Sequence, residues 1–108
     1  METLLVLTCL PDAESARRLA EHLVESRLAA CVNLLASCRS VYRWEGKIEN
    51  AEEVPLLIKT RADRYAALET AIRARHPYEL PEIIAVPVTS GLPGYLAWVA
   101  AETEELSC

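Results

Sequence analysis

Apolar and polar residues follow one another along this chain in blocks typical of a small α+β domain. Residues 3–10 form a continuous apolar run before Pro11, which predicts a strand covered on both faces. Apolar residues then recur at helical spacing over 13–26, and Asp12 stands where a carboxylate can cap the helix. A second apolar run, 29–35, predicts the next strand.

A hairpin is predicted in the middle of the chain. After a polar break, strict alternation places Tyr42 and Trp44 on one face of a strand. Glu45-Gly46-Lys47 is a turn signal because glycine accepts a positive φ. Ile48 is predicted to begin the return, and the third strand is predicted over 54–60. Pro55 cannot donate to a ladder and belongs at a strand start, a bulge or an edge.

The second half repeats the helix–strand pattern. Asp63 is placed to cap a helix over 64–75, with Tyr65, Leu68, Ala71 and Ile72 inward, and His76-Pro77 ends it. A strand over 82–90 and a short carboxy-terminal helix follow. This order predicts a ferredoxin-like βαββαβ fold, an antiparallel sheet with helices on one face.

The two outer strands of such a sheet are the second and the fourth, at 29–35 and 82–90. Both are rich in apolar residues, and Pro87 inside the fourth suits an edge position. Proteins seldom leave long apolar edges bare, and the hairpin around Gly46 extends beyond what two helices can cover. We therefore predict a homo-oligomer joined edge to edge through these strands.

Composition narrows the class of protein. With 108 residues and a net charge of −5, we expect one domain over 1–108 and no binding of nucleic acid, because there is no basic run. The apolar amino-terminal run is too short to cross a membrane and has no basic flank, which predicts a cytoplasmic protein with no membrane association. Its four cysteines (Cys9, Cys31, Cys38 and Cys108) lack zinc-finger spacing and are expected to be reduced.

Residues 76–88 differ from the rest of the chain. A His, a Tyr and two carboxylates lie around two prolines, Pro77 and Pro81, just before an apolar run. Proline restricts its own φ and that of the preceding residue, so these side chains sit on a stiff connector. The segment is either a polar loop or part of a binding or metal site.

Several motifs in this chain resemble those of the CutA divalent-cation tolerance family. The resemblance covers nearly the whole sequence. It rests on Leu28–Asn33 (LAACVN), Ser40–Ile48 (SVYRWEGKI), Leu57–Thr60 (LIKT), His76–Ile83 (HPYELPEI) and Gly94–Trp98 (GYLAW).

This resemblance implies a ferredoxin-like fold assembled as a homotrimer, with long hairpins pairing between subunits. It also implies tolerance to copper or other divalent cations, weakly bound, and no established enzymatic reaction. The trimer resembles that of PII-like signalling proteins, so the alternative function is ligand sensing with metal binding incidental and a downstream protein partner.

Four residues are candidate metal ligands. Cys31 matches the cysteine of the family motif, and its thiolate would suit Cu(I), while a buried strand cysteine is its structural alternative. His76 with Glu79 or Glu82 is a harder donor set that suits zinc and other divalent ions. One chain supplies few ligands, so neighbouring subunits would have to complete the coordination.

Four further residues are candidates for a pocket or an interface. Tyr42 and Trp44 either pack across strands or form one wall of an intersubunit pocket. Lys59, at a strand end, is either solvated or neutralises an anion, and Tyr78 belongs to the proline-bounded segment. A nucleophilic enzyme built on Cys31 and His76 is a third possibility, but the sequence shows no basic neighbour beside Cys31, and we predict no enzymatic activity.

Overall fold

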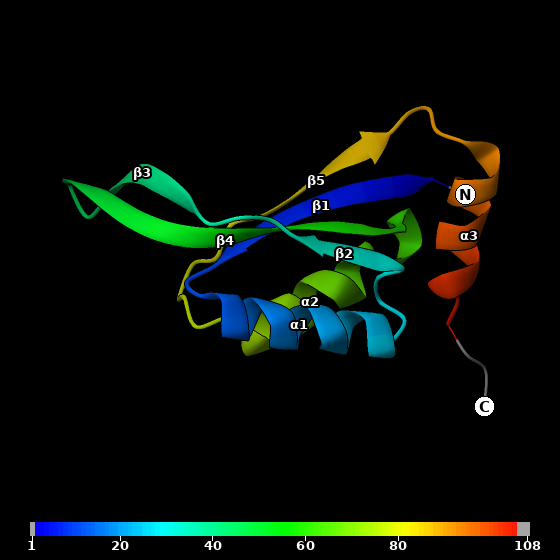
Figure 1. Cartoon of the computed structure of the whole chain (residues 1–108), viewed down its shortest axis with the longest axis horizontal. Coiled ribbons are helices and arrows are strands. Elements are labelled where there is room, and N and C mark those ends of the chain that lie inside the picture. The colour runs from blue at the N-terminus through cyan, green and yellow to red at the C-terminus, as the bar shows by residue number, and fades with distance from the viewer. Residues whose placement is uncertain (1, 106–108) are drawn as a thin grey trace.

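The computed structural model describes residues 2–105 and shows an antiparallel sheet with three α-helices (Figure 1). Within that range the strands run in the order β2-β4-β1-β5, with β3 pairing along the far half of β4. The strands are β1 (Thr3–Leu10), β2 (Cys31–Leu34), β3 (Cys38–Trp44), β4 (Lys47–Arg61) and β5 (Ile83–Val88). The helices are α1 (Ala13–Glu25), the 3-10 turn η1 (Ala62–Arg64), α2 (Tyr65–Arg75) and α3 (Pro93–Glu102). None of the described helices is long and apolar enough to span a bilayer.

Helices α1 and α2 cover one face of the sheet, as the pattern predicted (Figure 1). The core between them and the strands is closed, because its main side chains are fully buried and alternate along β1 and β4. Its largest members are Val6, Leu10, Leu23, Leu56, Ile58, Leu68 and Ile72. Tyr65 and Ala71 pack against this cluster from α2, which confirms the predicted inward stripe.

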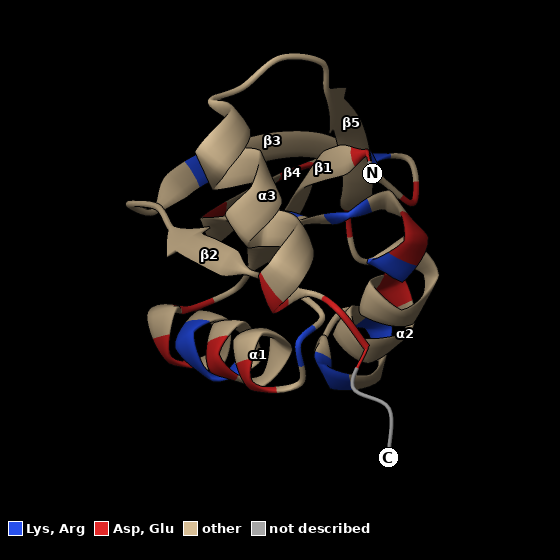
Figure 2. Cartoon of the chain, turned by 90° about the vertical axis from the view of Figure 1, so that its right-hand side faces the viewer, with Lys and Arg blue, Asp and Glu red and all other residues tan. Residues whose placement is uncertain are grey.

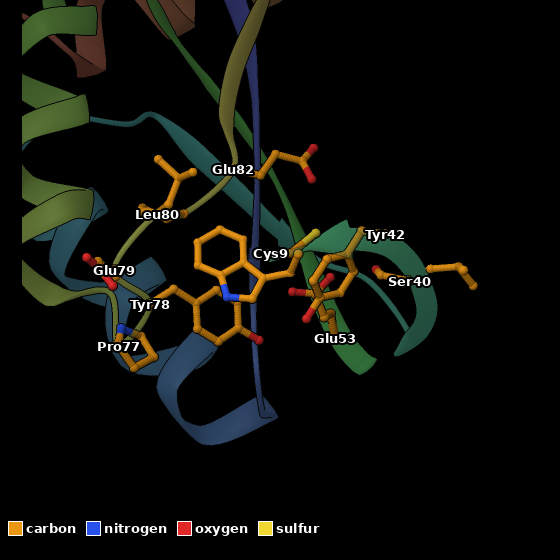
Figure 3. Close-up of a pocket in the computed structure, with 12 residues that line it drawn as sticks. Cys9, Ser40, Tyr42, Glu53, Pro77, Tyr78, Glu79, Leu80 and Glu82 are labelled. Atoms are coloured by element: carbon orange, nitrogen blue, oxygen red, sulfur yellow. The ribbon is translucent and has the colours of Figure 1, made fainter. Parts of the chain in front are cut away.

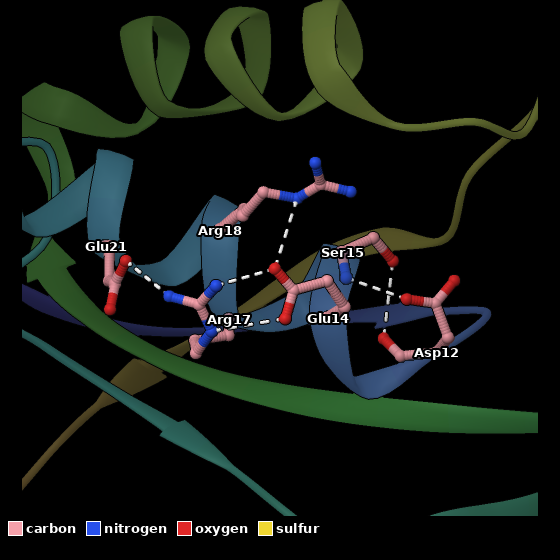
Figure 4. Close-up of polar contacts among 6 residues, drawn as sticks. All are labelled: Asp12, Glu14, Ser15, Arg17, Arg18 and Glu21. Carbon is pink, nitrogen blue, oxygen red and sulfur yellow. Dashed lines mark hydrogen bonds and ion pairs between the residues drawn. The ribbon is translucent and has the colours of Figure 1, made fainter.

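The start of α1 is fixed by polar contacts (Figure 4). The Asp12 carboxylate accepts from the Ser15 backbone N–H at 2.7 Å, and this bond is the main reason that the pKa of Asp12 is lowered. One turn later Arg17 pairs with Glu14 at 2.6 Å and with Glu21 at 2.9 Å. The predicted Asp12 cap is therefore confirmed.

Helix α2 begins differently from the prediction. Asp63 does not cap it: the carboxylate pairs with Arg61 at 2.7 Å and lies inside the turn η1. The residue that precedes α2, Arg64, has no side-chain capping bond. The ion pair with Arg61 takes the oxygens that a cap would use.

The hairpin is longer than its apolar pattern indicated. β4 begins at Lys47, next to the predicted return at Ile48, and continues without a break into the predicted strand 54–60, because full pairing with β3 extends the ladder through a polar stretch. Glu45 and Gly46 both have positive φ, at 50° and 79°, which matches a tight two-residue turn. In Figure 1 this hairpin projects well beyond the two helices.

Pro55 lies inside β4 and is tolerated there by a bulge. Between the pairs Leu34–Leu56 and Cys38–Glu53, three residues of the partner side face two residues of β4. Leu35 donates its N–H to the Pro55 carbonyl at 3.0 Å, so the side of Pro55 that lacks a donor faces this break. Of the three predicted settings, the bulge is the one found.

The outer strands are β2 and β5, as predicted. β2 is shorter than the predicted 29–35, since Leu28 and Ala29 donate their N–H groups back to the Leu23 carbonyl in the turn after α1. β5 carries Pro87, and its Ile84 and Val86 are each 52% exposed. Helix α3 packs at the end of the sheet, where Val99 is fully buried.

Candidate functional site

The face of the sheet turned away from α1 and α2, here called the open face, is largely uncovered. Alternation along the paired strands assigns every second residue to this face. Its apolar members are Leu5, Leu7, Leu57, Ile84 and Val86, and they are half-buried or exposed. Polar and titratable side chains lie mainly at the two ends of this face.

A hollow of about 930 Å³ lies at one end, beside the base of the hairpin. We call it the carboxylate hollow. Three segments build it: the end of β1, the hairpin, and the loop between α2 and β5 (Figure 3). Its lining residues are Cys9, Ser40, Val41, Tyr42, Trp44, Glu53, Pro77, Tyr78, Glu79, Leu80, Pro81 and Glu82.

The electrostatics of the hollow favour neutral or positive groups. Burial, followed by the Glu82 and Glu53 carboxylates, raises the pKa of the Cys9 thiol to about 12. Burial and the Glu53 carboxylate likewise raise the pKa of Tyr78 to about 12. Both groups therefore stay protonated at neutral pH, and the carboxylates give the hollow a negative potential.

His76 ties the loop to the end of β1. Its ring is buried, and its Nε2 lies 2.6 Å from the Cys9 carbonyl oxygen, which can only accept. The Nδ1 atom then accepts from the Tyr78 N–H at 3.1 Å. Both ring nitrogens are thus engaged, and the ring centroid lies 4.8 Å from that of Tyr78. Metal ligation by His76 would require one of these bonds to break.

Cys31 lies at the other end of the open face, in a separate cluster. It stands opposite Lys59 on β4, and the Lys59 Nζ lies 3.9 Å from its Sγ. Lys59 also donates to the Asn33 Oδ1. The sequence interpretation found no basic neighbour for Cys31 and was wrong on that point, because the neighbour comes from across the sheet. Tyr95 of α3 adjoins the thiol, and its pKa is raised by burial and then by Cys31.

The predicted metal-binding residues are therefore only partly brought together. Glu79 and Glu82 line the hollow, whereas His76 and Cys31 are not among its lining residues. Cys9 pairs with Pro55 and Cys31 with Lys59, four residues further along β4, which is roughly 13 Å along a strand. Within residues 2–105 no three His, Cys, Asp or Glu side chains lie close enough to hold one ion. The ligand set stays a prediction that needs a neighbouring chain.

Three of the four residues predicted for a pocket or an interface, Tyr42, Trp44 and Tyr78, line the hollow. The fourth, Lys59, belongs to the Cys31 cluster. Sequence reasoning missed Glu53 and gave Cys9 no secure role. The Cys38–Glu53 pairing brings Glu53 to the hollow, and only the register of a polar hairpin could have revealed it. Cys9, Cys31 and Cys38 are free thiols, and Cys108 lies outside the described residues.

The fold and this site define a class: α+β proteins in which the end of β1, a long hairpin and a proline-bounded loop enclose an acidic, aromatic hollow beside an open sheet face. The CutA1 divalent ion tolerance protein family model matches residues 4–102, and the chain belongs to this family.

Relatives from distant organisms agree with this assignment. The chain is 48% identical to Protein CutA of Mus musculus over 101 residues, which is 94% of this chain but 56% of the mouse protein. It is 45% identical to a divalent-cation tolerance protein CutA of Pectobacterium atrosepticum, covering 93% of this chain and 91% of that protein. The crystal structure of CutA from Xylella fastidiosa superposes with a TM-score of 0.93 at 47% identity, covering 96% and 100% of the two chains.

Proposed function

We propose that this protein supports tolerance to divalent cations by binding them weakly at the carboxylate hollow. The observation that carries the proposal is the hollow itself, where three carboxylates gather and no lysine, arginine or histidine is among the lining residues. Carboxylate oxygens are ligands for divalent ions, and a thiol such as Cys9 would add preference for copper once deprotonated. The family is described by ion tolerance and not by a reaction, in keeping with the expected lack of enzymatic activity.

The active form that we propose is a ferredoxin-like subunit in a homotrimer. The open face, the bare β5 edge and the protruding hairpin supply apolar surface for such an assembly. Residues of a second subunit placed against the hollow would bring the ligands that one chain lacks. Under this proposal Cys31, His76, Glu79 and Glu82 are candidates whose partners come from different subunits.

Copper is one candidate ion, with zinc and other divalent cations as alternatives, and the cytoplasm is the proposed location. The second function, a PII-like sensor with its own protein partner, has no specific observation in its favour. The three relatives described above are named for CutA or for cation tolerance, and none of those names refers to signalling.

Calorimetric titration with copper and zinc under reducing conditions tests the proposal. The wild-type protein should bind with weak affinity, and Glu79→Gln and Glu82→Gln should each weaken binding, because each removes a negative oxygen donor. Cys31→Ser and His76→Ala test the remaining ligand predictions. Glu25→Gln, an exposed carboxylate on α1, is the matched control with the same change of charge. Isotherms for all four site variants that equal that of Glu25→Gln would refute the site.

A further inference from the structure

The carboxy-terminal end of α3 is held by two arginines from other parts of the chain, here called the arginine clamp. Arg27, in the turn after α1, donates from Nη2 to the Ala101 carbonyl at 2.8 Å and from Nε to the Glu104 carbonyl at 3.0 Å. Arg61, at the end of β4, donates to the Ala100 carbonyl at 3.3 Å. The last carbonyls of a helix have no partner within it, so the clamp supplies donors that α3 itself lacks. In Figure 2 this end of α3 lies beside the end of α1.

Arg27 occupies a backbone position that normally favours glycine. Its φ is 61°, in the left-handed region that is uncommon for residues with a side chain. The Leu28 N–H donates to the Leu23 carbonyl. The Arg27 N–H donates to the Val24 carbonyl, which completes a helix-ending motif whose left-handed residue is most often glycine. Glycine would end α1 without strain, so it is the contact of the arginine side chain with α3 that accounts for this residue.

Apart from the clamp, α3 has little attachment to its own chain. Val99 is the only buried residue among residues 93–102, whereas Leu92, Tyr95 and Trp98 are 73%, 40% and 43% exposed. Tyr95 adjoins Cys31 at the end of the open face, and its ring centroid lies 5.6 Å from that of Trp98. The aromatic side of α3 therefore continues the apolar open face. A segment with so few buried contacts is typical of those that open locally.

We propose that the arginine clamp is a latch: it fixes α3 in the position from which the aromatic side of the helix joins the open face in contact with a second copy of this chain. A second copy fits this surface because it is apolar and continuous with the open face, and the single charge of α3, Glu102, lies at the clamped end. The role of the latch rests on the proposed function, since only a homotrimer has an interface for α3 to join. With the clamp broken, α3 would have to be ordered again whenever subunits meet, which lowers the apparent affinity between them.

Arg27→Gly separates the latch from the ending of α1. Glycine relieves the strain of the left-handed backbone, so the end of α1 should be at least as stable as in the wild type. The clamp bonds are lost, and in the assembled protein the amides of α3 should exchange with deuterium about tenfold faster, the scale of one lost hydrogen bond to a charged group. Light scattering on dilution should show a dissociation constant that is higher by at least about tenfold.

Arg27→Gln and Arg73→Gln form a matched pair with the same change of charge. Arg27→Gln should repeat the loss seen in Arg27→Gly, whereas Arg73 is exposed on α2 and its variant should behave as the wild type. Arg61→Gln is an independent variant, because it removes the bond to the Ala100 carbonyl. Its control is Asp63→Asn, which weakens the ion pair of Arg61 with Asp63 but leaves the arginine in place to hold α3.

The expected result is faster exchange in α3 alone, together with weaker association. Wild-type exchange of α3 in Arg27→Gly would overturn the inference, because apolar contacts would then be enough to hold the helix. Equal acceleration in α1, α2 and α3 would overturn it too, and so would faster exchange of α3 with unchanged association. A monomeric wild type would refute the homotrimer of the proposed function and the latch with it, whereas a trimeric wild type with unchanged Arg27 variants would refute the latch alone.

Discussion

The two faces of the sheet differ in how much of their structure one chain can complete. The face under α1 and α2 has a closed core, with Leu56 and Ile58 fully buried. On the open face the neighbouring residues of the same strands, such as Leu57, remain half-buried. Figure 2 shows a contrast in charge between the helices: Lys, Arg, Asp and Glu gather on α1 and α2, whereas α3 carries a single charged residue, Glu102, at its end. Helices of the same chain cover the first face, whereas on the open face apolar side chains are left for the proposed assembly to cover.

The largest effect is expected from breaking the closed face. Leu56→Ala should lower the free energy of unfolding by about 2 to 5 kcal/mol, because the cavity is enclosed on all sides. The measurement is chemical denaturation at several protein concentrations, and the loss should be the same at each. Leu57→Ala is the matched control one residue away. Its effect should appear mainly as weaker association, and hence grow as the protein is diluted. Equal and concentration-independent losses in the two variants would mean that the faces do not differ.

A charge on the open edge should separate the chains while leaving each of them folded. In Val86→Lys the ammonium would lie in the proposed seam between subunits, where an unpaired charge is costly. Light scattering at micromolar concentration should then give the mass of one chain instead of three, with the far-UV circular dichroism of the wild type. Ala67→Lys, on the exposed side of α2, is the control and should keep the wild-type mass. A wild-type protein that is already monomeric would refute the proposed assembly.

Much of the closed face could be predicted from the sequence, because the signals for its helices and strands lie among residues that are neighbours in the chain. Apolar spacing in the predicted helices and a cap residue such as Asp12 need only the neighbouring residues in the chain. Asp63 was misassigned because its competing partner, Arg61, takes part in a turn that apolar periodicity does not describe. The sequence indicates the return at Ile48 but not that the polar stretch before residue 54 belongs to the same strand, because the ladder with β3 holds that stretch as a strand without burial.

The candidate site was harder to predict because the pairing register of the strands brings together residues that are far apart in the sequence. Tyr78, Glu79 and Glu82 are adjacent in the chain and stood out, but Glu53 reaches them only through the hairpin, and Cys9 only through the end of β1. Cys31 and His76 looked compatible as ligands in sequence, yet the antiparallel pairing puts Cys31 at the other end of the open face. Residue types can suggest the chemistry of such a site, while its membership depends on which strand pairs with which.

The smallest effect concerns the end of the open face, where the buried Cys9 side chain lines the hollow. Its pKa is about 12 in the folded protein against an ordinary value of 9.0 in an unfolded chain. The folded state therefore holds this proton more tightly, so its contribution to stability is complete below pH 9 and is lost as the pH rises toward 12. Tyr78, raised from 10.0 to about 12, adds to the same decline. The free energy of unfolding should fall with pH over this range in the wild type, and less steeply in Cys9→Ala. Cys38→Ala, which removes an exposed thiol, should keep the wild-type slope. Equal slopes in wild type and Cys9→Ala would show that the thiol is hydrated in solution, and that the floor of the hollow is open to water.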